Sequence, residues 1–271
     1  MELRIGISPC PNDTVQFEAL YEKQIDMAPH TLHFDFQDVE TLNKAAATEQ
    51  YDIIKISYAR YFAVSDKYIL FRAGSALGFG VGPLLITSTP LSREAIMNGH
   101  VALPGKETTA HFLFNRAYPN HPNKYFIPFN EIEGAVQSGQ ADAGVIIHEN
   151  RFTYASRGLH KIVDLGAYWE TETGLPIPLG GIAIRRALPI EVQQQMAQAL
   201  NRSVAKAFEP KPYGLSHFVQ THAQEMAPDI MQQHIDLYVN EESRAISEKG
   251  IQAIRAMGHF LGAEERLPWW L

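Results

Sequence analysis

Short apolar runs alternate with stretches of helical periodicity along most of the chain. Leu32–Phe36 alternates apolar and polar positions, as a half-buried strand does. Strands that alternate with helical patterns are typical of βα units. The pattern therefore predicts an α/β fold with a largely parallel sheet. The predicted strands are Leu3–Ile7, Leu32–Phe36, Tyr51–Ile56, Tyr68–Arg72, Pro83–Thr87, Val101–Leu103, Tyr125–Pro128, Ala143–Ile147, Lys161–Leu165 and Leu179–Ile184.

Helices are predicted between these strands and over the last third of the chain. Asn12 or Asp13 is predicted to cap a helix through Phe17, and Asp38 to cap the next helix. From Ile190 onward the pattern is helical. One apolar stripe there recurs every four residues and is predicted to be buried. Its members are Val192, Met196, Leu200, Val204 and Phe208.

The order of the elements divides the chain into two lobes. Residues 1–88 and 180–271 form one discontinuous α/β lobe, and residues 89–179 form an inserted α/β lobe. Two crossings of the chain make a hinge, and a ligand is expected in the central cleft. The sequence thus predicts a two-lobed α/β protein that closes on a small molecule.

Composition and charge exclude several classes of function. Apolar residues make up 45% of the 271 residues and charged residues 20%, which is typical of a globular protein. The net charge is −7, and the sequence lacks the cluster of basic residues that is typical of a nucleic-acid-binding protein. No apolar run approaches the roughly 20 residues of a membrane span, and the start does not resemble a signal peptide.

These features predict a soluble, cytoplasmic protein with no nucleic-acid and no membrane partner. The oligomeric state stays open, with a homodimer the commonest arrangement among soluble oligomers. The apolar end Leu267–Leu271 is expected to pack either on the body of the protein or on a second subunit.

Familiar cofactor motifs are incomplete. Gly78–Pro83 has the glycines of a dinucleotide loop, but a predicted strand follows it where that motif needs a helix. Gly105–Thr108 is similar to part of a P-loop, but the required earlier glycine is His100. The single cysteine, Cys10, allows no intrachain disulfide, and no ligand spacing indicates a metal. We therefore expect no nucleotide cofactor and no metal.

Two strand-to-helix junctions carry candidate binding groups. Lys55, Ile56 and Ser57 end a strand, at the edge where open α/β sheets bind ligands. The lysine can donate to a carboxylate, the serine can do so or cap the next helix, and the isoleucine can contribute through its backbone. Thr108 and Thr109 begin a helix after a glycine turn, where they either bind an anionic oxygen or only cap the helix.

His148 is the candidate base. It follows the predicted strand Ala143–Ile147, and histidine titrates near neutrality, which suits proton abstraction. The alternative is a structural histidine with satisfied hydrogen bonds. Position 152 is Phe, so the zinc motif His-Glu-x-x-His is not formed.

Taken together, these segments resemble the 1,4-dihydroxy-6-naphthoate synthase family of the futalosine route to menaquinone. The similarity covers most of the chain, and the order and spacing of the segments make it specific. The matching segments are Ser8–Thr14, Asp38–Asn43, Lys55–Tyr58, Gly78–Pro83, Thr108–Ala110, Ile146–Tyr154, Asp164–Gly166 and Thr173–Pro176.

The resemblance implies a type II periplasmic-binding-protein fold and a lyase. The implied reaction converts cyclic dehypoxanthinylfutalosine, a small carboxylated substrate, to 1,4-dihydroxy-6-naphthoate and dihydroxyacetone without a cofactor. It also implies that His148 is the proton acceptor. The implied substrate-binding residues are Lys55, Ile56, Ser57, Thr109 and Ala110.

Two other functions remain open at this stage. One is a chorismate dehydratase-like enzyme of the same pathway, against which the Ile146–Arg151 segment favours the synthase. The other is a non-catalytic cytoplasmic small-molecule-binding protein, which would bind its ligand tightly without turnover.

Overall fold

The computed structural model describes residues 1–210, 214–223, 227–263 and 269–271. The chain divides into two compact units. Unit 1 comprises Met1–Gly78 and Pro178–Leu271, and unit 2 comprises Phe79–Ile177. The first boundary lies ten residues earlier than the predicted one at 88/89, because Leu84–Thr87 pairs with strands of unit 2. The second lies two residues earlier than the predicted 179/180.

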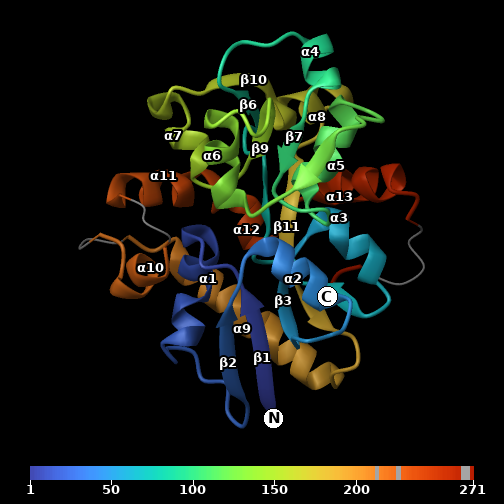
Figure 1. Ribbon diagram of the computed structural model, residues 1–271. Coiled ribbons are helices and arrows are strands. Elements are labelled where there is room, and N and C mark those ends of the chain that lie inside the picture. Colours follow the sequence, from blue (N-terminus) through green and yellow to red (C-terminus); the bar gives the residue numbers. More distant parts are fainter. Residues whose placement is uncertain (211–213, 224–226, 264–268) are drawn as a thin grey trace. The chain divides into compact units, whose positions relative to one another are not determined.

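Unit 1 is built on a six-stranded mixed sheet (Figure 1). Its order is β2-β1-β3-β11-β4, with β5 pairing β11. The first three strands in this order run parallel, whereas β11 is antiparallel to both of its neighbours β3 and β4. The prediction of a largely parallel sheet therefore holds only for part of this sheet. The strands are β1 Glu2–Ile7, β2 Thr31–Phe36, β3 Ile53–Ser57, β4 Tyr68–Leu70, β5 Ala76–Gly78 and β11 Ile177–Arg185.

An apolar core lies between the sheet and helices of unit 1, and a separate apolar cluster includes Phe218, Val219 and Ile235. The predicted stripe of α9 is confirmed, since Met196, Leu200 and Val204 are buried against β1 and α1. Phe208 follows the last residue of α9 and is partly buried. The helices are α1 Pro11–Tyr21, α2 Val39–Ala46, α3 Tyr58–Tyr61, α9 Ile190–Ala207, α10 His217–His222, α11 Pro228–Tyr238, α12 Glu241–Arg244 and α13 Glu248–Phe260, with a 3₁₀ turn at Phe62–Val64.

Unit 2 has its own five-stranded sheet, in the order β10-β6-β9-β7-β8. Strands β9, β7 and β8 are parallel, and β6 is antiparallel to β9 and β10. The strands are β6 Leu84–Thr87, β7 Val101–Leu103, β8 Lys124–Phe126, β9 Ala143–Ile146 and β10 His160–Asp164. The helices are α4 Arg93–Asn98, α5 Thr109–Ala117, α6 Ile132–Gln137, α7 Asn150–Thr153 and α8 Leu165–Thr173, with 3₁₀ turns at Phe129–Glu131 and Ala155–Arg157.

Helix caps test the sequence predictions locally. Asp38 caps α2 as predicted, because its side chain accepts from the backbone N–H groups of Glu40 and Thr41. The predicted cap at Asn12 or Asp13 is wrong. Helix α1 begins at Pro11, a residue that favours the first helical position because it has no N–H to satisfy, and Cys10 is its N-cap.

The described end of the chain packs on unit 1. The backbone of Trp269 accepts a hydrogen bond from Leu70 N at 2.7 Å, and Leu271 N donates to Leu70 O at 2.8 Å. The Trp269 side chain is buried against Phe62. Residues 267 and 268 of the predicted apolar end lie outside the described residues. Among the helices that the structure describes, none is both long and apolar enough to span a membrane.

Candidate functional site

In unit 1, the predicted residues Lys55, Ile56 and Ser57 form the carboxyl end of β3, which is a parallel neighbour of β1. Lys55 and Ser57 are two positions apart on β3, so their side chains leave the strand on one face. The Lys55 ammonium donates to Asp13 Oδ1 at 2.5 Å. Ser8 Oγ donates to the other carboxylate oxygen of Asp13 at 2.6 Å. The lysine and aspartate side chains are almost completely buried, which makes this an internal ion pair.

Ser57 is held by a reciprocal pair of hydrogen bonds. Asn43 Nδ2 donates to Ser57 Oγ at 2.9 Å, and Ser57 N donates to Asn43 Oδ1 at 2.9 Å. The serine occupies the N-cap position of α3, but its side chain makes no capping bond. Ile56 is fully buried, so only its backbone can serve a ligand. The hydroxyl of Ser57 therefore does not act as a simple helix cap, because it is bonded to Asn43 instead.

Opposite this part of β3 lie two glycines of β11. Gly180 pairs with Ser57 and Gly181 with Ile56. A Cβ atom at Gly180 would come within 2.9 Å of the Ile56 carbonyl oxygen. Glycine is needed there because the two backbones approach so closely.

In unit 2, Thr108 is a true helix cap. Its Oγ1 accepts from His111 N at 3.2 Å and donates to Gly105 O at 2.8 Å. The capping role therefore belongs to Thr108. Thr109 and Ala110 form the first turn of α5, and binding of an anionic oxygen by its backbone N–H groups stays a prediction.

His148 follows β9 in an unusual backbone conformation. Its φ of 55° lies in the left-handed region, which few residues other than glycine adopt. This conformation turns the chain out of the strand before α7 begins at Asn150. The half-buried imidazole packs edge-on against Phe129, with ring centroids 4.9 Å apart. Because β7 and β9 are parallel neighbours, Thr109 and His148 follow adjacent strand ends of one sheet.

The segment after His148 is anchored at several points. Arg151 Nη2 contacts Asp164 Oδ2 at 3.1 Å, and its Nη1 donates to Gly82 O. A Cβ atom at Gly82 would lie only 2.2 Å from Gly166 Cα, so the two backbones touch. The glycine-rich segment thus serves close backbone packing, and strand β6 follows it as predicted.

An acidic pair lies beside the histidine. Burial raises the pKa of Glu149, the negative charge of Glu133 raises it further, and Arg157 opposes the shift. Arg157 forms an ion pair with Glu133. Within the described part of the chain, Glu149 Oε2 and Glu133 Oε1 are buried without a hydrogen-bond partner.

Asp13 and Asn43 were missed as site residues at the sequence level. Both stand in segments that match the family, but an ion pair 42 residues apart leaves no signal in local spacing. Among the described residues, no cluster of three or more His, Cys, Asp or Glu side chains could hold a metal ion.

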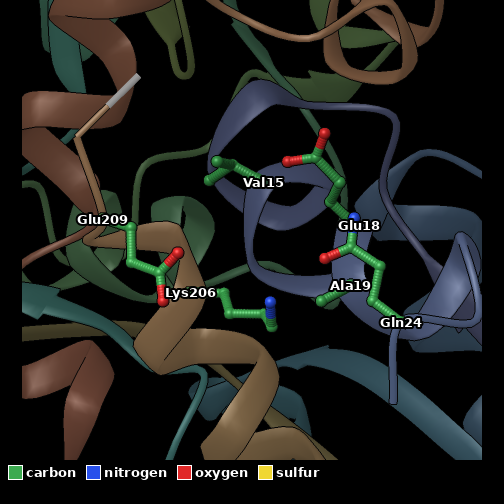
Figure 2. Close-up of a pocket in the computed structure, with 6 residues that line it drawn as sticks. All are labelled: Val15, Glu18, Ala19, Gln24, Lys206 and Glu209. Carbon is green, nitrogen blue, oxygen red and sulfur yellow. The ribbon is translucent and has the colours of Figure 1, made fainter. Parts of the chain in front are cut away.

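A small pocket in unit 1 does not belong to this site. It measures about 100 Å³ and lies where α1 meets the end of α9 (Figure 2). None of the predicted site residues lines it. Its lining residues are Val15, Glu18, Ala19, Gln24, Lys206 and Glu209.

Known structures show which fold this is. A crystal structure of a protein from Archaeoglobus fulgidus is 29% identical and superposes with a TM-score of 0.88, covering 96% of this chain and 98% of that one. The alkanesulfonate-binding protein of Xanthomonas axonopodis, 14% identical, has a TM-score of 0.69 over 98% of this chain and 94% of that one. A Candida albicans protein described as having the generic periplasmic-binding-protein fold, 11% identical, has a TM-score of 0.68 over 98% and 92%. The predicted periplasmic-binding-protein-like fold is confirmed.

Sequence relatives show the family. Proteins named 1,4-dihydroxy-6-naphthoate synthase are 41% identical in Thermus thermophilus, over 97% of this chain and 94% of that one, and in Streptomyces coelicolor, over 98% and 95%. The menaquinone biosynthesis family model matches residues 3–262. The chain therefore belongs to the menaquinone biosynthesis family.

Proposed function

We propose that this protein is a 1,4-dihydroxy-6-naphthoate synthase, a carbon–carbon lyase. Its substrate would be cyclic dehypoxanthinylfutalosine, and its products 1,4-dihydroxy-6-naphthoate and dihydroxyacetone. The observation that carries the proposal is the 41% identity to two proteins of that name over nearly the full length of each chain. Formation of an aromatic ring supplies driving force for the cleavage.

In this proposal, His148 is the general base. Its neutral imidazole removes a proton from the substrate and starts the cleavage, a role that contributes about 10²- to 10⁴-fold to a rate. Support comes from its place two residues after the end of β9, its partial exposure and its left-handed backbone. Residues held in strained conformations are frequent at active sites, because the surrounding structure must enforce them.

Substrate binding is assigned to Lys55, Ile56, Ser57, Thr109 and Ala110. Lysine carries three N–H donors, and within the described residues Asp13 is the one hydrogen-bond acceptor of the Lys55 ammonium. Two donors therefore remain for a carboxylate. The first turn of α5 offers backbone N–H groups to a second anionic or polar oxygen.

The test is incubation of the purified protein with cyclic dehypoxanthinylfutalosine. Naphthoate would be followed by absorbance and mass, and dihydroxyacetone by mass in equal amount. Parallel incubation with chorismate tests the dehydratase. Naphthoate with dihydroxyacetone supports the synthase, and turnover of chorismate alone would overturn it. Tight binding of the futalosine derivative without product would favour a non-catalytic binding protein.

A further inference from the structure

A chain of buried polar side chains runs through unit 1 and ends at Lys55. The Lys55 ammonium donates to Asp13 Oδ1 at 2.5 Å, and Asn12 Nδ2 donates to the same oxygen at 2.9 Å. Asn12 Oδ1 lies 2.8 Å from His234 Nε2. Each of these four side chains belongs to a residue that is at most 6% exposed. The chain thus connects β3, the start of α1 and the middle of α11.

The charge of Asp13 fixes the direction of every bond in this chain. A carboxylate only accepts hydrogen bonds, so the amide nitrogen of Asn12 must face it. The amide oxygen of Asn12 then faces His234, whose Nε2 must carry a proton and donate. His234 is therefore a hydrogen-bond donor, and its donation holds the asparagine that helps to hold the aspartate.

Stability alone does not explain this arrangement. His234 is one of four buried residues of α11, with Met231, Ile235 and Tyr238, and its ring packs against that of Tyr238 with centroids 4.7 Å apart. Burying charged and polar groups carries a large desolvation cost, and replacing a buried ion pair by apolar side chains is often neutral or stabilising. What the polar chain does achieve is a fixed position for one ammonium group at the carboxyl end of β3.

We propose that His234 is a positioning residue that acts through Asn12 and Asp13 to orient the Lys55 ammonium toward the substrate carboxylate. The substrate half of this proposal rests on the proposed function. His234 does not touch the substrate in this proposal. It determines where Asp13 holds the lysine, from a position 222 residues away from Asn12 in the sequence.

Two variants of His234 separate hydrogen bonding from packing. His234→Phe keeps a ring of similar size but removes the donor. His234→Gln places an amide N–H near the position of Nε2 and should keep the bond to Asn12. His217→Phe, at an exposed histidine of α10, is the control for loss of a histidine elsewhere in unit 1.

The first readout does not depend on activity. In protein labelled with ¹³C-lysine, the Lys55 Cε signal is assigned as the one lost in Lys55→Arg. We expect His234→Phe to move this signal, and His234→Gln and His217→Phe to leave it at the wild-type position. An unmoved signal in His234→Phe would overturn the proposal, because the polar chain would then not reach the lysine.

The second readout is turnover of cyclic dehypoxanthinylfutalosine. Loss of one hydrogen bond in a charged network should raise the KM about tenfold in His234→Phe with little change in kcat, since binding and not chemistry is affected. His234→Gln should restore the KM. A KM in His234→Gln as high as in His234→Phe would overturn the donor role. If wild type gives no product, the proposed function fails, and the Lys55 signal alone decides whether His234 positions the lysine.

Discussion

The strand ends of unit 1 and unit 2 hold their polar groups in different ways. Around Lys55, the buried groups pair with one another: the ammonium with Asp13, and Ser57 with Asn43 in both directions. Around His148, the backbone is left-handed and two buried carboxylate oxygens, of Glu149 and Glu133, have no hydrogen-bond partner among the described residues. The polar groups named at the end of β3 are thus hydrogen-bonded to one another. The segment around His148 instead contains an unfavourable backbone conformation and buried oxygens without a described hydrogen-bond partner.

This difference matches the two roles proposed. A group that binds an anion benefits from being fixed in advance, because less freedom is then lost on binding. A base must instead project from the end of the strand, and the left-handed turn at His148 directs it there. This backbone conformation is unfavourable, so contacts of the neighbouring residues must stabilise it. Arg151, which contacts Asp164 and Gly82, is the clearest of these anchors.

The largest expected effect concerns His148. His148→Gln should lower kcat by about 10²- to 10⁴-fold and leave the KM nearly unchanged, because a general base acts in the chemical step. Steady-state kinetics with cyclic dehypoxanthinylfutalosine measures both. The control is His160→Gln, at an exposed histidine of β10, which should behave as wild type. Wild-type turnover by His148→Gln would remove the histidine from the role of base.

The second largest effect tests whether the stability of unit 1 depends on the buried ion pair between Asp13 and Lys55. Asp13→Asn leaves the buried Lys55 ammonium without its counter-charge, so the free energy of unfolding should fall by about 3–5 kcal/mol. Urea denaturation measures this loss, and the exposed Asp66→Asn should show almost none. The double variant Asp13→Asn with Lys55→Met should lose less than the sum of the single variants, since no charge is left unpaired. Strict additivity would show that the ion pair is not coupled.

Much of the fold could be predicted because its signals are local. The strands are apolar runs between breakers, the buried stripe of α9 repeats every four residues, and Asp38 caps α2 within its own turn. The start of α1 was predicted wrongly because two good capping residues, Asn12 and Asp13, follow a proline that begins the helix. Those two side chains are instead used in long-range hydrogen bonds.

What could not be predicted depends on the tertiary fold. Asp13 meets Lys55 across 42 residues, and His234 meets Asn12 across 222, so no spacing rule finds either contact. The boundary between the units at Gly78 and Phe79 depends on the tertiary fold for the same reason. Nothing in the run Leu84–Thr87 shows that it pairs antiparallel with β9 and β10.

A smaller effect is expected at the close backbone contact between Gly82 and Gly166 in unit 2. Gly82→Ala places a methyl group against the Gly166 backbone, so one chain must shift, and overpacking of this kind costs about 1–3 kcal/mol. Gly134→Ala is the matched control. It lies exposed in α6 with nothing near its added methyl group and should stabilise the protein by about 0.5–1 kcal/mol. Thermal unfolding measures both changes. A Gly82→Ala protein as stable as wild type would mean that the contact with Gly166 is easily relaxed.

The smallest effect is a pH dependence that unit 2 should show through Glu149. Burial raises the pKa of this carboxyl above its usual 4.5, so the folded protein holds the proton to higher pH than the unfolded chain does. Its contribution to stability is therefore fully present below pH 4.5 and is lost as the pH rises through the folded-state pKa. Glu149→Gln cannot ionise, so it should match wild type at about pH 4 and be the more stable protein at about pH 7.

Denaturation of both proteins across that range measures the difference, with the exposed Glu131→Gln as a control that should follow wild type. The opposite result, with Glu149→Gln less stable at neutral pH, would mean that the ionised carboxylate is favoured by Arg157 more than it is penalised by burial and by Glu133. The acidic pair beside His148 would then be a satisfied network like that around Lys55, and the contrast between the two strand ends would be reduced to the left-handed backbone of the histidine.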